Sequence, residues 1–289
     1  QPAASGMAVG FDGAVALLVL LCAQPAFGVW ENRKPTLLSS KAENEVLIFT
    51  KSTGCAHEST PFAAAFLART AQQLGFRPVV SNDSTLLEKS NSDCGFDAIV
   101  FVSNTGQLFD TAKEHLSAHI AAGKGVLGLH SVIGAFRSER KRADGTREST
   151  YSSNLMEDVF GAHFAWHAAP HPPACEGTVT IAEEEGRRLG LEGKIDFEFS
   201  HHGEFFNFDK NPADAEGIVT IATVDESSYD GGSMGEIHPV VWRRELGDKH
   251  APIFYCGLGH GKENYDPNSK SEVKEILEAG MKYVLGVNV

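Results

Sequence analysis

The chain has 289 residues, of which 42% are hydrophobic and 22% charged, enough for one large domain or for two small ones. The formal net charge of -13 argues against a nucleic-acid or anionic-membrane partner, because a polyanion would be repelled. Five cysteines are scattered without a CxxC pair, which excludes a zinc ribbon but leaves one or two disulfides open. We expect a single large domain over residues 45–289.

The N-terminal segment contains a short apolar run, Ala14–Ala23. The run is too short for a stable membrane span but has the length of a signal-peptide core, and small residues follow it. We therefore expect residues 1–28 to be an expression remnant followed by a signal peptide, residues 29–44 to be an N-terminal extension, and the protein to be secreted or extracytoplasmic. No lysine or arginine precedes the apolar run, so a buried N-terminal helix remains the alternative.

Apolar strands and amphipathic helices alternate through the first half of the domain. This alternation, with short connections, predicts an α/β fold with a doubly wound, mostly parallel sheet and helices on both faces. The expected strands are 45–50, 77–81, 97–103 and the apolar run within 123–131, and the expected helices are 60–74 and 110–122.

The second half is less regular. The segment 137–147 mixes basic and acidic residues and is expected to be a solvated loop. Residues 163–174 (HFAWHAAPHPPA) are expected to be a loop, and 197–208 (FEFSHHGEFFNF) to be a polar, aromatic connection. The expected helices are 149–160 and 271–285, and the expected strands are 178–182, 217–224, 240–243 and 252–256.

His130 is the first polar side chain after the buried strand within 123–131. In open α/β sheets, ligands bind beyond the carboxyl ends of the strands, so His130 is a candidate for chemistry. The alternative is a histidine that caps the strand and hydrogen-bonds a neighbouring loop.

Several motifs in order resemble the ThuA-like family, named for trehalose utilisation: VLIFTKSTGCAHEST, FVSNTGQLF, GKGVLGLHS, VFGAHFAWH, EFFNF, ATVDESSYDGGSMGEIHPVVWRRE and FYCGLGH. The resemblance covers about residues 45–286 and implies a flavodoxin-like fold similar to the class I glutamine amidotransferases. In those relatives the turn after the central strand carries a nucleophilic cysteine. His130 and Ser131 stand there in this chain, so thiol attack on a glutamine amide is not expected, and Cys55 is a poor substitute.

A polar rim is expected at the carboxyl edge of the sheet. We expect its catalytic residues to lie around one pocket. Three nitrogen or oxygen ligands with an open position would suit zinc or a related divalent ion, although no tight HExxH spacing is present. Without a metal, the same groups could act as general acid and base, or could be structural histidines. The candidate catalytic residues, which are also the candidate metal ligands, are His57, His130, Glu204 and His260.

A second set of residues is expected to contact the substrate. The loop 225–238 (DESSYDGGSMGEIH) has acidic, hydroxyl and glycine residues suited to a polyol, and nearby aromatic rings could pack on a sugar. The alternative is an ordered turn whose first residue caps the chain locally. The candidate substrate contacts are Ser131, His163, His167, Asp225, Tyr229, His238 and Trp242.

The resemblance and the polar rim together predict a protein that acts on a carbohydrate or sugar-derived small molecule by hydrolase or lyase chemistry. The alternative is a secreted protein that binds carbohydrate, or serves as a structural interaction protein, without turnover. The sequence predicts no oligomeric state.

Overall fold

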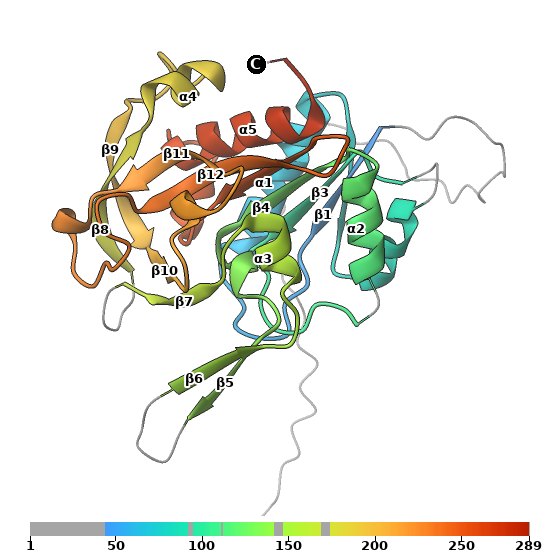
Figure 1. Ribbon diagram of the computed structural model, residues 1–289. Coiled ribbons are helices and arrows are strands. Elements are labelled where there is room, and N and C mark those ends of the chain that lie inside the picture. The colour runs from blue at the N-terminus through green and yellow to red at the C-terminus, as the bar shows by residue number, and fades with distance from the viewer. Residues whose placement is uncertain (1–43, 92–94, 111, 142–146, 169–173, 289) are drawn as a thin grey trace, which may run out of the picture. The chain divides into compact units, whose positions relative to one another are not determined.

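The computed structural model describes residues 44–91, 95–110, 112–141, 147–168 and 174–288 (Figure 1). The expected signal peptide and nearly all of the expected N-terminal extension lie outside these residues. Within the described part of the chain, no helix is long and apolar enough to cross a membrane. Of the cysteines in that part, Cys55, Cys175 and Cys256 are free thiols.

A nine-stranded sheet runs through the domain in the order β2-β1-β3-β4-β13-β12-β11-β8-β9. Its first five strands are parallel to one another, as the strand–helix alternation predicts. Buried, mostly apolar runs form β1, β3, β4 and β13, whereas the edge strand β2 is partly exposed, and all five residues of β3 and of β4 are buried. The parallel strands are β1 (Glu45–Phe49), β2 (Arg77–Ser81), β3 (Ala98–Val102), β4 (Gly125–Leu129) and β13 (Ala251–Cys256).

The remaining strands extend the sheet in antiparallel pairs from β13 outward. The sheet is therefore parallel from β2 to β13 and antiparallel from β13 to β9. The predicted parallel arrangement is found in the half that runs from β2 to β13. The antiparallel strands are β12 (Pro239–Leu246), β11 (Val219–Val224), β8 (Ala174–Ile181) and β9 (Glu198–Glu204).

Helices cover both faces of the parallel half, as predicted (Figure 1). One face packs against α1 and α5, whose Leu67 and Ile276 join the core that contains Ile48. The other packs against α2 and α3, whose Leu116 and Phe160 join the second core cluster. The helices are α1 (Thr60–Gln73), α2 (Lys113–Ala121), α3 (Leu155–Phe160), α4 (Glu183–Arg188) and α5 (Glu272–Leu285), and the 3₁₀ turns are Ser84–Asn91, His130–Gly134, Pro212–Asp214, Glu226–Ser228 and Lys262–Tyr265.

Two small sheets correct the sequence predictions. The expected loop 137–147 forms instead the hairpin of β5 (Arg137–Lys141) and β6 (Arg147–Tyr151), which projects from the domain in Figure 1. The expected helix 149–160 therefore begins only at Leu155. The hairpin is fixed at its base because the Arg137 guanidinium donates to Ser149 Oγ, and Tyr151 donates to the Phe164 carbonyl.

The second small sheet pairs β7 (Phe164–His167) with β10 (Phe206–Phe208) in antiparallel fashion. Both segments were expected to be irregular, because strands of four and three residues are too short to give a periodic signal. The pairing brings His167, at the end of β7, close to Glu204, which lies just before β10 and about 40 residues further along the sequence.

Candidate metal centre

His130 lies at the sharp turn where β4 ends and a 3₁₀ turn begins. Its φ of +53° lies in the left-handed region, which costs a residue with a Cβ about 1–2 kcal/mol. The neighbouring strand β13 holds the turn, since the buried Tyr255 hydroxyl donates to the His130 carbonyl at 2.7 Å. The His130 ring is fully buried, and its Nδ1 lies 2.9 Å from the Gly257 carbonyl. Backbone and ring are therefore both fixed.

Four other side chains reach the same place from different elements. His57 belongs to the loop after β1, and His260 to the loop after β13. Because β1, β4 and β13 are parallel, the residues that follow them meet at one edge of the sheet. Glu204 ends β9, and His167 ends β7. The structure brings together the four residues that were expected to lie around one pocket: His57, His130, Glu204 and His260. It also places His167 against Glu204.

Three of these side chains form a nearly equilateral triangle of ligating atoms. Glu204 Oε2 lies 3.4 Å from His130 Nε2 and 3.2 Å from His260 Nδ1, and the two nitrogens are 3.3 Å apart. His57 offers a fourth ligating atom, and all four atoms lie within 4.8 Å of one another. His167 Nε2 approaches Glu204 Oε2 to 3.3 Å from the more exposed side. The group has the donor set of a three-histidine, one-carboxylate metal site.

The orientation of these atoms suits a cation between them. Glu204 Oε2 is buried and accepts no hydrogen bond from the described residues, although three imidazole nitrogens surround it. A carbonyl only accepts, so the proton of a neutral His130 is on Nδ1, and its Nε2 lone pair faces Glu204. Four ligands about 2.1 Å from a metal in a tetrahedron lie about 3.4 Å apart, which is close to the separations in the triangle.

The electrostatics also favour a bound cation. Burial by itself raises the pKa of the Glu204 carboxyl, but the facing His130, His167 and His260 rings outweigh burial and hold that pKa well below its usual range. Glu204 is therefore a carboxylate. Burial, followed by the proximity of His130, lowers the pKa of His57 to about 3. His57 is thus a neutral imidazole, the form that binds metals. The Glu204 carboxylate raises the pKa of His260.

A pocket of about 440 Å³ opens beside this centre, within the usual range of small-molecule sites. His57 and His260 form part of its wall and connect it to the buried Glu204. Most of its other side chains are polar, which suits a ligand rich in hydroxyl groups. The pocket is lined by Ala56, His57, Glu58, Ala174, His202, His260, Gly261, Lys262 and Glu263.

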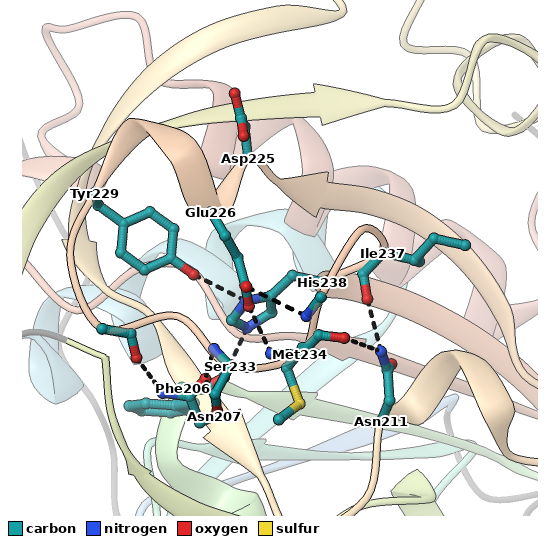
Figure 2. A network of polar contacts seen from close by, with 12 residues as sticks. Phe206, Asn207, Asn211, Asp225, Glu226, Tyr229, Ser233, Met234, Ile237 and His238 are labelled. Atoms are coloured by element: carbon teal, nitrogen blue, oxygen red, sulfur yellow. Dashed lines mark hydrogen bonds and ion pairs between the residues drawn. The ribbon is translucent and has the colours of Figure 1, made fainter.

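The loop 225–238 forms a closed polar network rather than an open polyol site (Figure 2). Glu226 accepts from the backbone N–H groups of Met234 and Gly235 and lies 2.8 Å from His238 Nδ1. His238 is fully buried, and its Nε2 lies 2.9 Å from the Phe206 carbonyl. The Tyr229 hydroxyl lies 2.8 Å from His238 Nδ1. These groups satisfy one another, so the loop is a structural brace.

Several expected substrate contacts are corrected on this basis. Asp225 caps a 3₁₀ turn by accepting from the Ser227 N–H, the alternative that the sequence left open. Trp242 is buried in the core, where its Nε1 donates to the Phe160 carbonyl, so it offers no face to a sugar. Tyr229 and His238 belong to the network of Figure 2.

The other expected contacts divide into two groups. Ser131 Oγ lies 3.5 Å from His57 Nδ1, and His167 lies against Glu204, so both belong to the candidate metal centre. His163 points elsewhere, towards Glu157 and Asp209. Sequence reasoning missed His201, a buried histidine whose Nε2 has no partner among the described residues and whose pKa burial lowers to about 4. The repeated histidines of the HHG sequence could have drawn attention to it.

The fold and the site define an α/β protein with a histidine- and glutamate-lined centre at the carboxyl edge of its sheet. The family model described as ThuA, trehalose utilisation, matches residues 45–284. The chain therefore belongs to the ThuA family. No curated protein sequence is significantly similar to it.

Solved structures share this fold. A ThuA-like protein from Bacteroides uniformis has a TM-score of 0.60 at 15% identity, over 87% of this chain and 95% of that one. A ThuA-like protein from Parabacteroides merdae has a TM-score of 0.55 at 14% identity, over 86% and 92%. The mmIFT52 N-terminal domain has a TM-score of 0.52 at 11% identity, over 85% and 99%. The expected family and the expected amidotransferase-like α/β fold are thus confirmed.

Proposed function

We propose that this protein is a divalent-metal-dependent enzyme that acts on a carbohydrate or sugar-derived small molecule by hydrolytic or lyase-type chemistry. The observation that carries the proposal is the triangle formed by Glu204 Oε2, His130 Nε2 and His260 Nδ1, with separations of 3.2 to 3.4 Å. Its atoms surround one point without hydrogen bonds to Glu204 Oε2 within the described residues, as metal ligands do.

His57, His130, Glu204 and His260 would hold a divalent cation, whose chemistry there would be to lower the pKa of a water and to polarise a substrate oxygen. The protein's own groups bind and orient the substrate around that point. His167 is 36% exposed at its side chain and contacts Glu204, so it can carry a proton between the centre and a bound ligand. The buried Phe206 packs against the His130 ring, with 4.7 Å between their centroids.

Two observations support a sugar as substrate. The family is described by trehalose utilisation, and the chain belongs to it over residues 45–284. The adjacent pocket of about 440 Å³ presents Glu58, Lys262 and Glu263, which can hydrogen-bond several hydroxyl groups at once. These groups would fix the sugar beside His57 and His260, which form the inner wall.

Metal content tests the first part of the proposal. The full chain is stripped with a chelator, reloaded with Zn²⁺, dialysed and measured by elemental analysis. Glu204→Gln keeps the size of the side chain but replaces the ligating charge, so we expect it to bind one equivalent less than the wild type. His202→Gln is the matched control, because His202 lies on the exposed pocket rim outside the ligand set. Equal zinc content in Glu204→Gln and the wild type would refute the metal role.

Turnover tests the second part. Zinc-loaded protein is incubated with trehalose and other disaccharides, and products are followed by nuclear magnetic resonance. We expect a new product that requires both zinc and Glu204. Binding of a disaccharide by calorimetry without any product would instead favour the carbohydrate-binding alternative.

A further inference from the structure

A second cluster of potential metal ligands lies away from the candidate metal centre. Glu157 comes from α3, His163 immediately precedes β7, and Asp209 immediately follows β10. His163 Nδ1 lies 3.6 Å from Glu157 Oε2 and 3.7 Å from Asp209 Oδ2. The three ligating atoms lie within 4.8 Å of one another.

His163 is the observation that points to a ligand. The ring is only 6% exposed. Its Nδ1 is directed at both carboxylates, yet at distances beyond a normal hydrogen bond. The ring is fixed because Tyr151 stacks on it at 3.8 Å between centroids, with 9° between the planes. A buried imidazole is thus held in place with its nitrogen aimed at a gap between two carboxylates.

The carboxylates are oriented towards the same gap. Asp209 Oδ1 accepts from the backbone N–H groups of His163 and Lys210, which leaves Oδ2 towards the His163 ring. Glu157 Oε1 faces the Lys210 ammonium, which leaves Oε2 towards His163. The Lys210 side chain is 78% exposed, so it compensates the negative charge only weakly.

We propose that Glu157, His163 and Asp209 bind a second divalent cation with a structural role. One imidazole and two carboxylates are a donor set for zinc or manganese, with open positions for water. Separations of 3.6 and 3.7 Å need only a small contraction to reach the roughly 3.4 Å of tetrahedral ligands about 2.1 Å from a metal.

The second cation would not share the chemistry of the first. His163 immediately precedes β7 and His167 ends it, so their backbones lie at most about 13 Å apart at roughly 3.3 Å per residue. Two-metal catalytic sites have their ions about 3.5–4 Å apart. A cation at His163 would instead join α3 to the sheet of β7 and β10, whose opposite end leads to His167 and Glu204.

Zinc stoichiometry in four versions of the full chain tests the proposal: wild type, Glu204→Gln, Asp209→Asn and the double variant. Asp209→Asn keeps the Oδ1 acceptor for both backbone N–H groups and replaces only the proposed ligand atom. Asp248→Asn, at an exposed turn, is the matched control. Glu157→Gln provides an independent variant if Asp209→Asn folds poorly.

We expect two equivalents in the wild type, one in each single variant and none in the double variant. Zinc should also raise the melting temperature of Glu204→Gln but not of the double variant. The second site would be overturned if the double variant still bound one equivalent of zinc. It would also be overturned if Glu204→Gln bound none. A single equivalent that Asp209→Asn removes and Glu204→Gln keeps would support the second site and refute the metal role of Glu204.

Discussion

Tyr255→Phe tests whether the turn at His130 is held from the neighbouring strand. The Tyr255 ring is fully buried, with its centroid 4.2 Å from that of Trp242 and 5.8 Å from that of Phe160. Phenylalanine keeps this packing. Among the residues that the structure describes, the change removes the 2.7 Å hydrogen bond to the carbonyl of His130, whose backbone is in the left-handed region.

The expected magnitude follows from what the lost hydroxyl leaves behind. A buried carbonyl without a partner costs about 1–3 kcal/mol, so we expect the free energy of unfolding to fall by that amount. The left-handed conformation of His130 costs about 1–2 kcal/mol, and the Tyr255 bond helps to offset it. Without that bond the His130 ring is less well positioned, and zinc affinity should fall on the order of 10-fold, as for other lost supporting contacts.

Urea unfolding gives the change in the free energy of unfolding. Zinc titration in the Asp209→Asn background measures the zinc affinity of the candidate metal centre alone. Ile253→Val is the matched control, because this fully buried residue lies on the same strand and its change costs about 0.5–1.5 kcal/mol without touching His130. The control should lose stability but keep its zinc affinity. If Tyr255→Phe retains the zinc affinity of the control, the reasoning that couples Tyr255 to the site is wrong.

Three further predictions follow from other parts of the chain. His130→Gln should lower turnover about 100-fold or more while the melting temperature changes modestly, and an unchanged rate would remove His130 from the mechanism. Hydrogen bonds from Arg243 lower the pKa of Glu185 below its ordinary 4.5, so this pair stabilises the fold above that pH and loses its contribution as pH falls through the lowered pKa. Urea unfolding from neutral to acid pH should therefore show a steeper loss in wild type than in Glu185→Gln, and equal slopes would contradict this. N-terminal sequencing of the protein from its native source should begin near Val29, as a cleaved signal peptide predicts, whereas an intact Met7 would refute cleavage.

The parallel half of the fold could be predicted because its central strands are buried apolar runs. β3 and β4 lie between helices on both faces, so their sequences are almost continuously apolar and contrast with the amphipathic helices. The same reasoning located His130, since a polar residue directly after such a strand lies at the carboxyl edge. The small sheet of β7 and β10 could not be predicted, because its pairing is long-range and its strands are only four and three residues long.

The polar loop 225–238 was the hardest segment to interpret from sequence. Its acidic, hydroxyl and histidine groups have the composition of a sugar site, but composition does not show whether polar groups face a ligand or one another. In the structure they face one another, because the buried His238 and the half-buried Glu226 would be costly without partners. A polar cluster in a glycine-rich loop is therefore weak evidence for ligand binding unless one of its atoms is left unpaired.

This loop explains how so small a sheet can position the site. A two-stranded sheet is marginal in water by itself, and β7 and β10 have only four and three residues. Asn207, in the middle of β10, donates to the Gly231 carbonyl and accepts from the Ser233 N–H, so the loop secures β10 from outside (Figure 2). The His163 cluster lies at one end of the sheet, and Glu204 and His167 lie at the other. A cation bound at His163 would thus stabilise one end of β7, the strand whose other end holds His167 against Glu204.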